Sequence, residues 1–288
     1  MRRWMLASLL ATALAGAAHR RHALSPSGAT GAAAVGTAVF GAGGLRGSAL
    51  LLLFFGSSTA LSRLSGVASN GAEAGPRRTL AQVLANGGLP AALAVCDHVR
   101  PSPHVAAAYA GALAAANADT WATEIGALSA TPPRMITSGR RVPRGVSGAV
   151  TPLGTLASLA GALVVGAGHA ALTGRPAATQ RLGVAGLAGS LADSVLGATL
   201  QAVYVCQRCG QCTEDREHAH GTDAPALTLV RGLPLITNDT VNLCASLVGA
   251  LVAYIAASRD HERRRVRSRS WPSPTRRRPL RSRRYSPP

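Results

Sequence analysis

The chain has 288 residues, of which 47% are hydrophobic, 15% are charged and only 3% are aromatic. A soluble domain of this length normally carries about a quarter charged residues, whereas packed membrane helices are rich in small side chains that let backbones approach closely. The composition argues against a soluble globular enzyme and favours a helical bundle in a lipid bilayer.

The formal net charge is +18, and all thirty basic residues are arginine. Twelve of them lie between Arg259 and Arg284, in a segment of Arg, Ser and Pro with almost nothing to bury, so we expect a disordered tail. Such a tail can bind RNA or anionic lipid headgroups, or can stay solvated on the positive side of the membrane. We expect no specific nucleic-acid partner.

Uncharged runs follow one another along the chain and predict membrane spans. About twenty residues cross the hydrocarbon layer, and the runs that begin at Gly28, Val150, Leu182 and Thr240 are long enough. Shorter runs cover residues 4–18, 47–62, 80–95 and 105–118. The sequence therefore predicts an all-α fold, a polytopic transmembrane helical bundle of six to eight spans.

Three regions follow from this pattern: an N-terminal hydrophobic segment over residues 1–22, a helical domain over 23–258 and the basic tail over 259–288. Arg2 and Arg3 precede a short apolar core, which is also typical of a cleaved leader. We favour a first helix over a leader.

Two carboxylates end the run that starts at Val105, in the block Asn117-Ala118-Asp119-Thr120-Trp121-Ala122-Thr123-Glu124. A charge at the centre of a membrane helix costs about 3 kcal/mol on insertion scales, so such an acid usually faces a polar cavity, a partner or an ion. Asp119 and Glu124 lie about 140° apart on an ideal helix, so they share a site only if the helix bends or ends. Alternatively, the block lies at the membrane surface with Asp119 in water.

A polar loop over residues 131–145 contains Arg140, Arg141 and Arg144 but no acid. Arginine grips phosphate oxygens bidentately, and Gly and Ser allow close backbone approach. The loop is therefore either a phosphate-binding loop or a positively charged topology signal.

Asp193 lies near the middle of an otherwise uncharged run, with Gly197 and Gln201 at four-residue intervals after it. This spacing places the three residues on one helix face. A polar stripe centred on one intramembrane carboxylate predicts a functional site, with a structural interhelical hydrogen bond as the alternative.

The block Thr237-Asn238-Asp239-Thr240-Val241-Asn242 opens the last run, where Asn or Asp by default caps a helix. If Asp239 and Asn242 face Asp119 and Asp193, they add oxygen ligands suited to a hard cation such as Mg²⁺. The candidate metal ligands are therefore Asp119, Asp193 and Asp239.

Cys206, Cys209 and Cys212, followed by His218 and His220, have the spacing of soft metal ligands. They come just after a membrane run, so incidental cysteines in a variable loop are the simpler interpretation. The odd total of five cysteines implies no disulfide framework.

The order of these blocks resembles one family of polytopic membrane proteins. The matching segments are ANADTWATEIGALS, PPRMITSGRRVPRGVSGAVTPLGTLASLAG, GSLADSVLGATLQ and NDTVNLCASLVGAL, preceded by ALSPSGATGAAAVGTAVFGAGG and QVLANGG. They resemble the transmembrane protein 19 family, which includes the plant chloroplast phytyl-phosphate kinase of tocopherol synthesis. The likeness runs over residues 23–257 and is more specific for the family than for the activity, because most members lack a known reaction.

The resemblance to the kinase members implies an enzyme that transfers a phosphoryl group from a nucleotide, CTP or another, to a prenyl or phytyl monophosphate. Such transfer depends mainly on positioning and charge neutralisation. The implied roles give Mg²⁺ and substrate positioning to Asp119, Glu124 and Asp193. The implied substrate and phosphate contacts are Arg140, Arg141, Arg144, Asn117, Gln201 and Asn242.

The same resemblance implies a chloroplast or other organelle membrane, with an endomembrane as the alternative. Two other functions remain open. A transporter would use the intramembrane acids as ion sites, although the chain has no convincing internal repeat. A scaffold would use the bundle only as an anchor for the basic tail.

Overall fold

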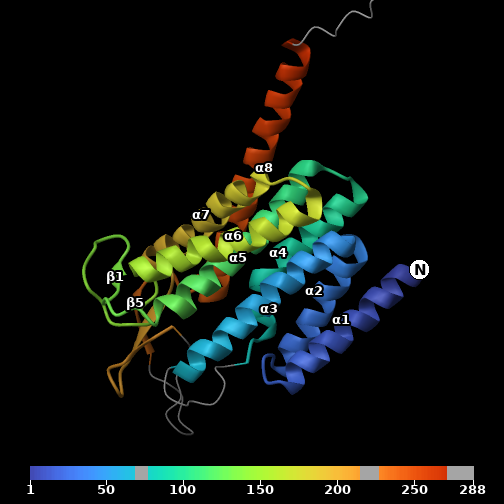
Figure 1. Ribbon diagram of the computed structural model, residues 1–288. Coiled ribbons are helices and arrows are strands. Elements are labelled where there is room, and N and C mark those ends of the chain that lie inside the picture. Colours follow the sequence, from blue (N-terminus) through green and yellow to red (C-terminus); the bar gives the residue numbers. More distant parts are fainter. Residues whose placement is uncertain (69–76, 215–226, 271–288) are drawn as a thin grey trace, which may run out of the picture.

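The computed structural model describes residues 1–68, 77–214 and 227–270. Helices dominate these residues, and short strands lie at one end of the bundle (Figure 1). The helices are α1 (Arg2–Arg20), α2 (Pro26–Ala42), α3 (Gly44–Ala68), α4 (Leu80–Val99), α5 (Pro103–Gly126), α6 (Pro152–Thr173), α7 (Ala177–Thr199) and α8 (Asn238–Ser270). The strands are β1 (Arg134–Met135), β2 (Ala149–Val150), β3 (Val203–Cys206), β4 (Cys212–Thr213) and β5 (Leu227–Arg231).

Five helices in the described part of the chain are long and apolar enough to cross a bilayer: α3 over Gly44–Leu64, α4, α6, α7, and α8 over Asn238–Arg259. Helix α2 has only 17 residues. Helix α5 has 24 residues but is not among the five, and Asn117, Asp119 and Glu124 lie within it. The prediction of a polytopic helical bundle is confirmed.

Helix α5 is the centre of the bundle and contacts α3, α4, α6, α7 and α8. Its residues 108–118 are buried without interruption and are mostly Ala and Gly. A Cβ on Gly186 of α7 would lie 2.8 Å from the carbonyl oxygen of Ala114, and one on Gly249 of α8 would lie 2.6 Å from that of Gly111. The small residues are therefore required because the helices pack backbone against backbone.

The N-terminal segment forms α1, which packs along α2. Ala7, Ala11 and Ala15 form its buried stripe, and a Cβ on Gly36 of α2 would lie 2.9 Å from that of Ala11. The outer face of α1 exposes large apolar side chains such as Leu6, as expected of a helix in contact with lipid.

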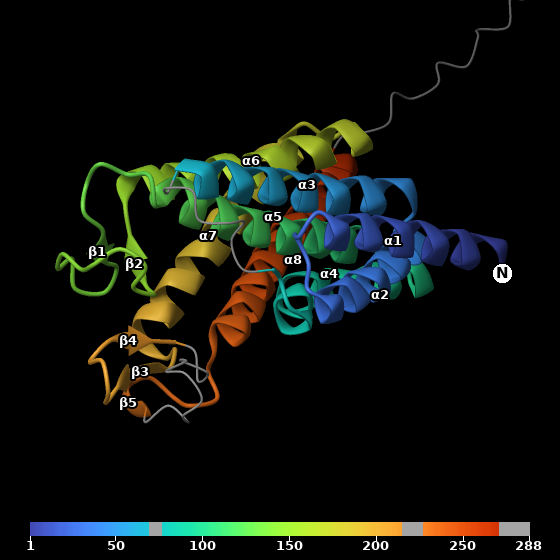
Figure 2. The same ribbon diagram turned by 90° about the horizontal axis from the view of Figure 1, so that it is seen from below.

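Two small antiparallel sheets complete the described fold. Strand β1 pairs with β2, and β3 pairs with both β4 and β5. Both ribbon views place them at the end of the bundle where α5 and α7 end and α6 and α8 begin (Figure 2). These strands were not predicted from the sequence.

Helix α8 continues through Ser270, so it runs past Arg259, where we expected disorder to begin. Arginine has a high helix propensity, and the first proline after Arg259 is Pro272. Residues 271–288, the rest of the predicted tail, lie outside the described residues.

Candidate functional site

A polar cavity of about 370 Å³ lies between α5, α6 and α7, at the end of the bundle that carries the strands. The second half of α5, the loop before α6, the first turns of α6 and the second half of α7 form its wall. Its charged and polar lining side chains are Asp119, Asp193, Glu214, Arg144, Asn238, Thr123, Thr151, Thr155, Ser147, Ser158, Ser190 and Ser194.

Three carboxylates meet at this cavity. Asp119 comes from α5 and Asp193 from α7, and the negative charges of Asp119 and Glu214 both act on Asp193. The Oδ2 atom of Asp193 and the hydroxyl of Ser158 are buried and accept or donate no hydrogen bond within the described residues. Leaving buried polar atoms unpaired is costly, so this arrangement fits a cation or a polar ligand.

The N-terminus of α6 faces the same cavity. Thr151 caps the helix, because its hydroxyl oxygen accepts the Gly154 N–H at 3.0 Å, and Pro152 occupies the first helical position. Thr151, Gly154 and Thr155 all line the cavity. The positive end of the α6 dipole therefore lies at the same cavity as the carboxylates and favours an anionic group such as phosphate.

Arg144 adds a positive side chain to the wall. It donates to the carbonyl oxygen of Ala127 at 2.6 Å and to that of Ser129, so it holds the loop against the end of α5. The cavity thus combines acidic side chains with a guanidinium and a helix N-terminus. This combination can hold a divalent cation together with a phosphate group.

Gln201 and Arg231 fasten the loop that forms the cavity wall. The Gln201 amide donates to the Ser147 hydroxyl at 3.1 Å and to a Glu214 carboxylate oxygen at 2.6 Å. Arg231 donates to the carbonyl oxygens of Ser147 and Gly197 at 3.3 and 3.0 Å. Gln201 itself lies outside the lining, so its position supports the site rather than forming it.

The structure brings Asp119, Asp193 and Arg144 together and places Glu124 elsewhere. Glu124 accepts a hydrogen bond from the Ser62 hydroxyl at 2.5 Å, on the part of α5 that faces α3. It also interacts electrostatically with Arg78. The angular separation of Asp119 and Glu124 on an ideal helix is therefore kept in the fold.

Asn117 is buried and joins three helices rather than lining the cavity. Its Oδ1 accepts from the hydroxyls of Ser57 and Ser58 of α3 at 2.9 and 3.1 Å, and its Nδ2 donates to the Gly161 carbonyl of α6 at 2.8 Å. Through these contacts the Asn117 amide connects α3, α5 and α6, which gives it a structural role.

The remaining predicted residues also fall outside the cavity lining. Arg140 and Arg141 are exposed near the β1–β2 hairpin, and Asp239 and Asn242 lie in the first turns of α8, where Asn238 faces the cavity instead. Among the residues that the structure describes, no group of three or more His, Cys, Asp or Glu side chains is placed to hold a metal ion. Mg²⁺ often takes only one or two carboxylates, with water and substrate phosphate as its other ligands, so Asp119 and Asp193 alone fit it.

Several lining residues were missed from the sequence. Ser190 lies three residues before Asp193, and helical periodicity could have identified it. Ser194 directly follows Asp193, so this spacing did not indicate it. The predicted stripe instead ran through Gly197 and Gln201, which contact the loop at Ser147 and Gly148. Glu214 could not be predicted as a lining residue, because it follows a short strand with no periodic pattern.

The three clustered cysteines lie on the β3–β4 hairpin. Cys206 is buried, whereas Cys209 and Cys212 are exposed. The backbone amides of Cys209 and Arg208 bond to the Cys206 sulfur and lower the pKa of its thiol. His218 and His220, the other ligands considered for a metal, lie outside the described residues.

Comparison with known proteins places the chain in a family. The family described as integral membrane protein DUF92 matches residues 9–250. The chain belongs to this DUF92 family of integral membrane proteins. This match confirms the family-level resemblance read from the sequence, and the matched range contains Asp119, Arg144 and Asp193.

Two relatives of this DUF92 protein cover different shares of it. Protein PGR of Arabidopsis thaliana is 31% identical over 285 residues, which cover 88% of this chain and 96% of PGR. An uncharacterized membrane protein of Methanocaldococcus jannaschii is 31% identical over 178 residues, which cover 62% of each chain. No solved structure matches the chain. Neither relative's name states an activity.

Proposed function

We propose that this DUF92 protein is a membrane phosphotransferase that moves a phosphoryl group from a nucleotide, CTP in the first instance, to a prenyl or phytyl monophosphate. The observation that carries the proposal is the shared cavity of Asp119 and Asp193, with Arg144 and the α6 N-terminus on its wall.

The reaction needs little covalent help from the protein. A phosphate oxygen of the prenyl monophosphate attacks the terminal phosphorus of the nucleotide, the bond to the bridging oxygen breaks, and a prenyl diphosphate and a nucleoside diphosphate form. The attacking oxygen is already ionised, so no general base is required, and catalysis rests on positioning and charge neutralisation.

Residues from each side of the cavity would position the reacting phosphate groups. Mg²⁺ held by Asp119 and Asp193 would neutralise the phosphate oxygens. Arg144 and the positive end of the α6 dipole would orient the transferring group, because both lie at the cavity wall. The hydroxyls of Ser190 and Ser194 line the α7 side and can donate to further oxygens.

The proposal includes a chloroplast or other organelle membrane as the site of action. It rests on the resemblance to plant kinases, and an endomembrane is the alternative. A fluorescent fusion imaged with organelle markers in plant cells distinguishes the two.

The test is phosphate transfer from labelled CTP, ATP or GTP to phytyl, geranylgeranyl and farnesyl monophosphates in membranes that contain the full chain. We expect a labelled prenyl diphosphate that disappears when EDTA removes Mg²⁺. No product with any acceptor, in membranes where the protein is inserted and folded, would contradict the proposal. Ion-dependent uptake by proteoliposomes would then favour transport through the acidic cavity.

A further inference from the structure

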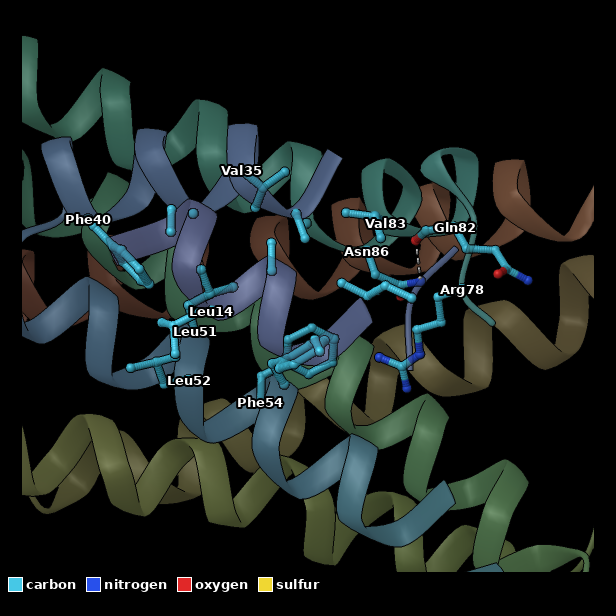
Figure 3. A pocket seen from close by; sticks show the side chains of 18 residues that line it. Leu14, Val35, Phe40, Leu51, Leu52, Phe54, Arg78, Gln82, Val83 and Asn86 are labelled. Carbon is cyan, nitrogen blue, oxygen red and sulfur yellow. Dashed lines mark hydrogen bonds between the residues drawn. The ribbon is translucent and has the colours of Figure 1, made fainter. Parts of the chain in front are cut away.

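A second cavity, of about 100 Å³, lies between α1, α2, α3 and α4 (Figure 3). It shares no lining residue with the acidic cavity. Leu14, Val35, Phe40, Leu51 and Phe54 supply most of its wall, and the figure shows them along its length. Its wall is apolar, which suits a hydrocarbon segment better than a polar solute, and its volume holds only a few methylene groups.

Three polar side chains, those of Arg78, Gln82 and Asn86, gather at one end of this cavity (Figure 3). The first turns of α4 hold the two amides in place. The Gln82 side-chain oxygen accepts the Thr79 N–H at 3.0 Å, and the Asn86 amide donates to the Gln82 carbonyl at 3.1 Å. The cavity therefore has one polar end and one apolar end.

The backbone fixes Arg78 at this polar end. Its N–H donates to the Ala23 carbonyl at 3.2 Å, and its carbonyl accepts the Ser25 N–H at 3.1 Å. Its guanidinium makes no hydrogen bond to any residue that the structure describes. The position just before α4 is therefore set by the chain, while the donors of the side chain remain available.

The charge of Arg78 is only partly compensated. Burial lowers the pKa of the Arg78 guanidinium, and the nearby Glu124 carboxylate raises it. Glu124 is itself engaged by the Ser62 hydroxyl. An arginine stays protonated in proteins, so a partly buried guanidinium beside an apolar cavity favours an anionic group at that end.

We propose that this cavity binds a single-chain lipid with a phosphate head group. The head group lies at Arg78, where a guanidinium can bind two phosphate oxygens at once. The part of the lipid chain next to the head group lies along the apolar wall between α1 and α3, and the rest of that chain extends into the bilayer. The Asn86 amide lies at the same end of the cavity. This lipid site is separate from the proposed chemistry, because the two cavities have no residue in common.

The test is native mass spectrometry of the purified full chain with oleoyl lysophosphatidate, and with monoolein as the neutral probe. Arg78→Gln should lower the affinity for lysophosphatidate about tenfold and leave monoolein unchanged. Arg77→Gln is the matched control, because Arg77 is the exposed neighbour and lies outside the cavity. Ala32→Phe, which fills the cavity, should weaken both probes, and Arg78→Lys should restore most of the preference for the anion.

Equal losses in Arg78→Gln and Arg77→Gln would overturn the proposal, because general surface charge would then explain binding. Unchanged binding in a folded Ala32→Phe variant, or in Ala18→Phe if the first is unstable, would also overturn it. Displacement of lysophosphatidate by inorganic phosphate alone would contradict the role of the chain. The assay forms no product, so a failed phosphotransferase test leaves its result unaffected.

Discussion

Asp119 of α5 and Asp193 of α7 line one cavity, although each is the acid of a different apolar run. The α6 N-terminus and Arg144 complete the wall around them. Two carboxylates placed together in a bundle with few other charges are mutually destabilising. This cost to folding is the reason for placing a cation between them in the proposed site.

Asp193→Asn should stabilise the ligand-free protein. The Asp193 Oδ2 has no hydrogen-bond partner among the described residues, and its neighbours Asp119 and Glu214 are acidic. Removing that repulsion should raise the free energy of unfolding by about 1 kcal/mol or more. Thermal unfolding in detergent measures it. A lower Tm would instead identify Asp193 as a structural hydrogen-bonding residue.

Divalent cations should raise the Tm of the parent protein through the same two carboxylates. A ligand at a hundred times its Kd stabilises the folded state by about 2.7 kcal/mol. Titration of Mg²⁺ or Mn²⁺ during thermal unfolding should show the increase in the parent and its loss in an Asp119→Asn/Asp193→Asn double variant. An unchanged Mg²⁺ effect in that variant would place the cation elsewhere.

Gly148→Ala should be more damaging than Gly139→Ala. Both glycines have positive φ, +83° and +66°, so alanine strains either backbone by about 1 kcal/mol. A Cβ on Gly148 would also lie 2.5 Å from the Cα of Ala198, whereas Gly139 has open space. We expect a clearly lower Tm for Gly148→Ala alone, and equal Tm values would show that the close packing of this loop against α7 is not required.

Asn117→Ala should cost about 1–3 kcal/mol of stability, because it leaves the buried Ser58 hydroxyl without its acceptor and removes the amide donor to the Gly161 carbonyl. The Ser57 hydroxyl can still donate to the Phe54 carbonyl. A double-mutant cycle with Ser58→Ala, read by thermal unfolding, should show coupling of at least about 0.5 kcal/mol. Additive losses would mean that the joint between α3 and α5 contributes little.

The helical bundle could be predicted from the sequence. A segment that crosses a bilayer must satisfy its backbone hydrogen bonds internally, so a long uncharged run has few alternatives to a helix. The runs at Val150, Leu182 and Thr240 correspond to α6, α7 and α8. The short strands could not be predicted, since two to five residues such as Arg134–Met135 contain too little periodicity. The helical extension to Ser270 was missed because composition alone was used for the tail.

The acidic residues of the site could also be predicted, because an isolated carboxylate within an apolar run is unusual. Which other residues belong to the site depends on how each helix is rotated about its own axis. Asn117 and Glu124 are close to Asp119 in sequence but face α3, and Gln201 supports the loop through Ser147 and Glu214. Only the packing of α5 against α3, α6 and α7 decides between these faces.

The most direct test of the proposed reaction compares Asp193→Asn with Asp97→Asn in purified protein, by nucleotide-dependent phosphorylation of phytyl monophosphate. Asp97 is a suitable control, because its carboxylate accepts the Ser102 N–H at 2.8 Å, at the far end of α5 from the cavity, and asparagine can still accept it. We predict that Asp193→Asn lowers kcat about 100-fold or more in a folded protein, while Asp97→Asn keeps parental activity. Equal activity of the two variants would contradict a catalytic site at the acidic cavity.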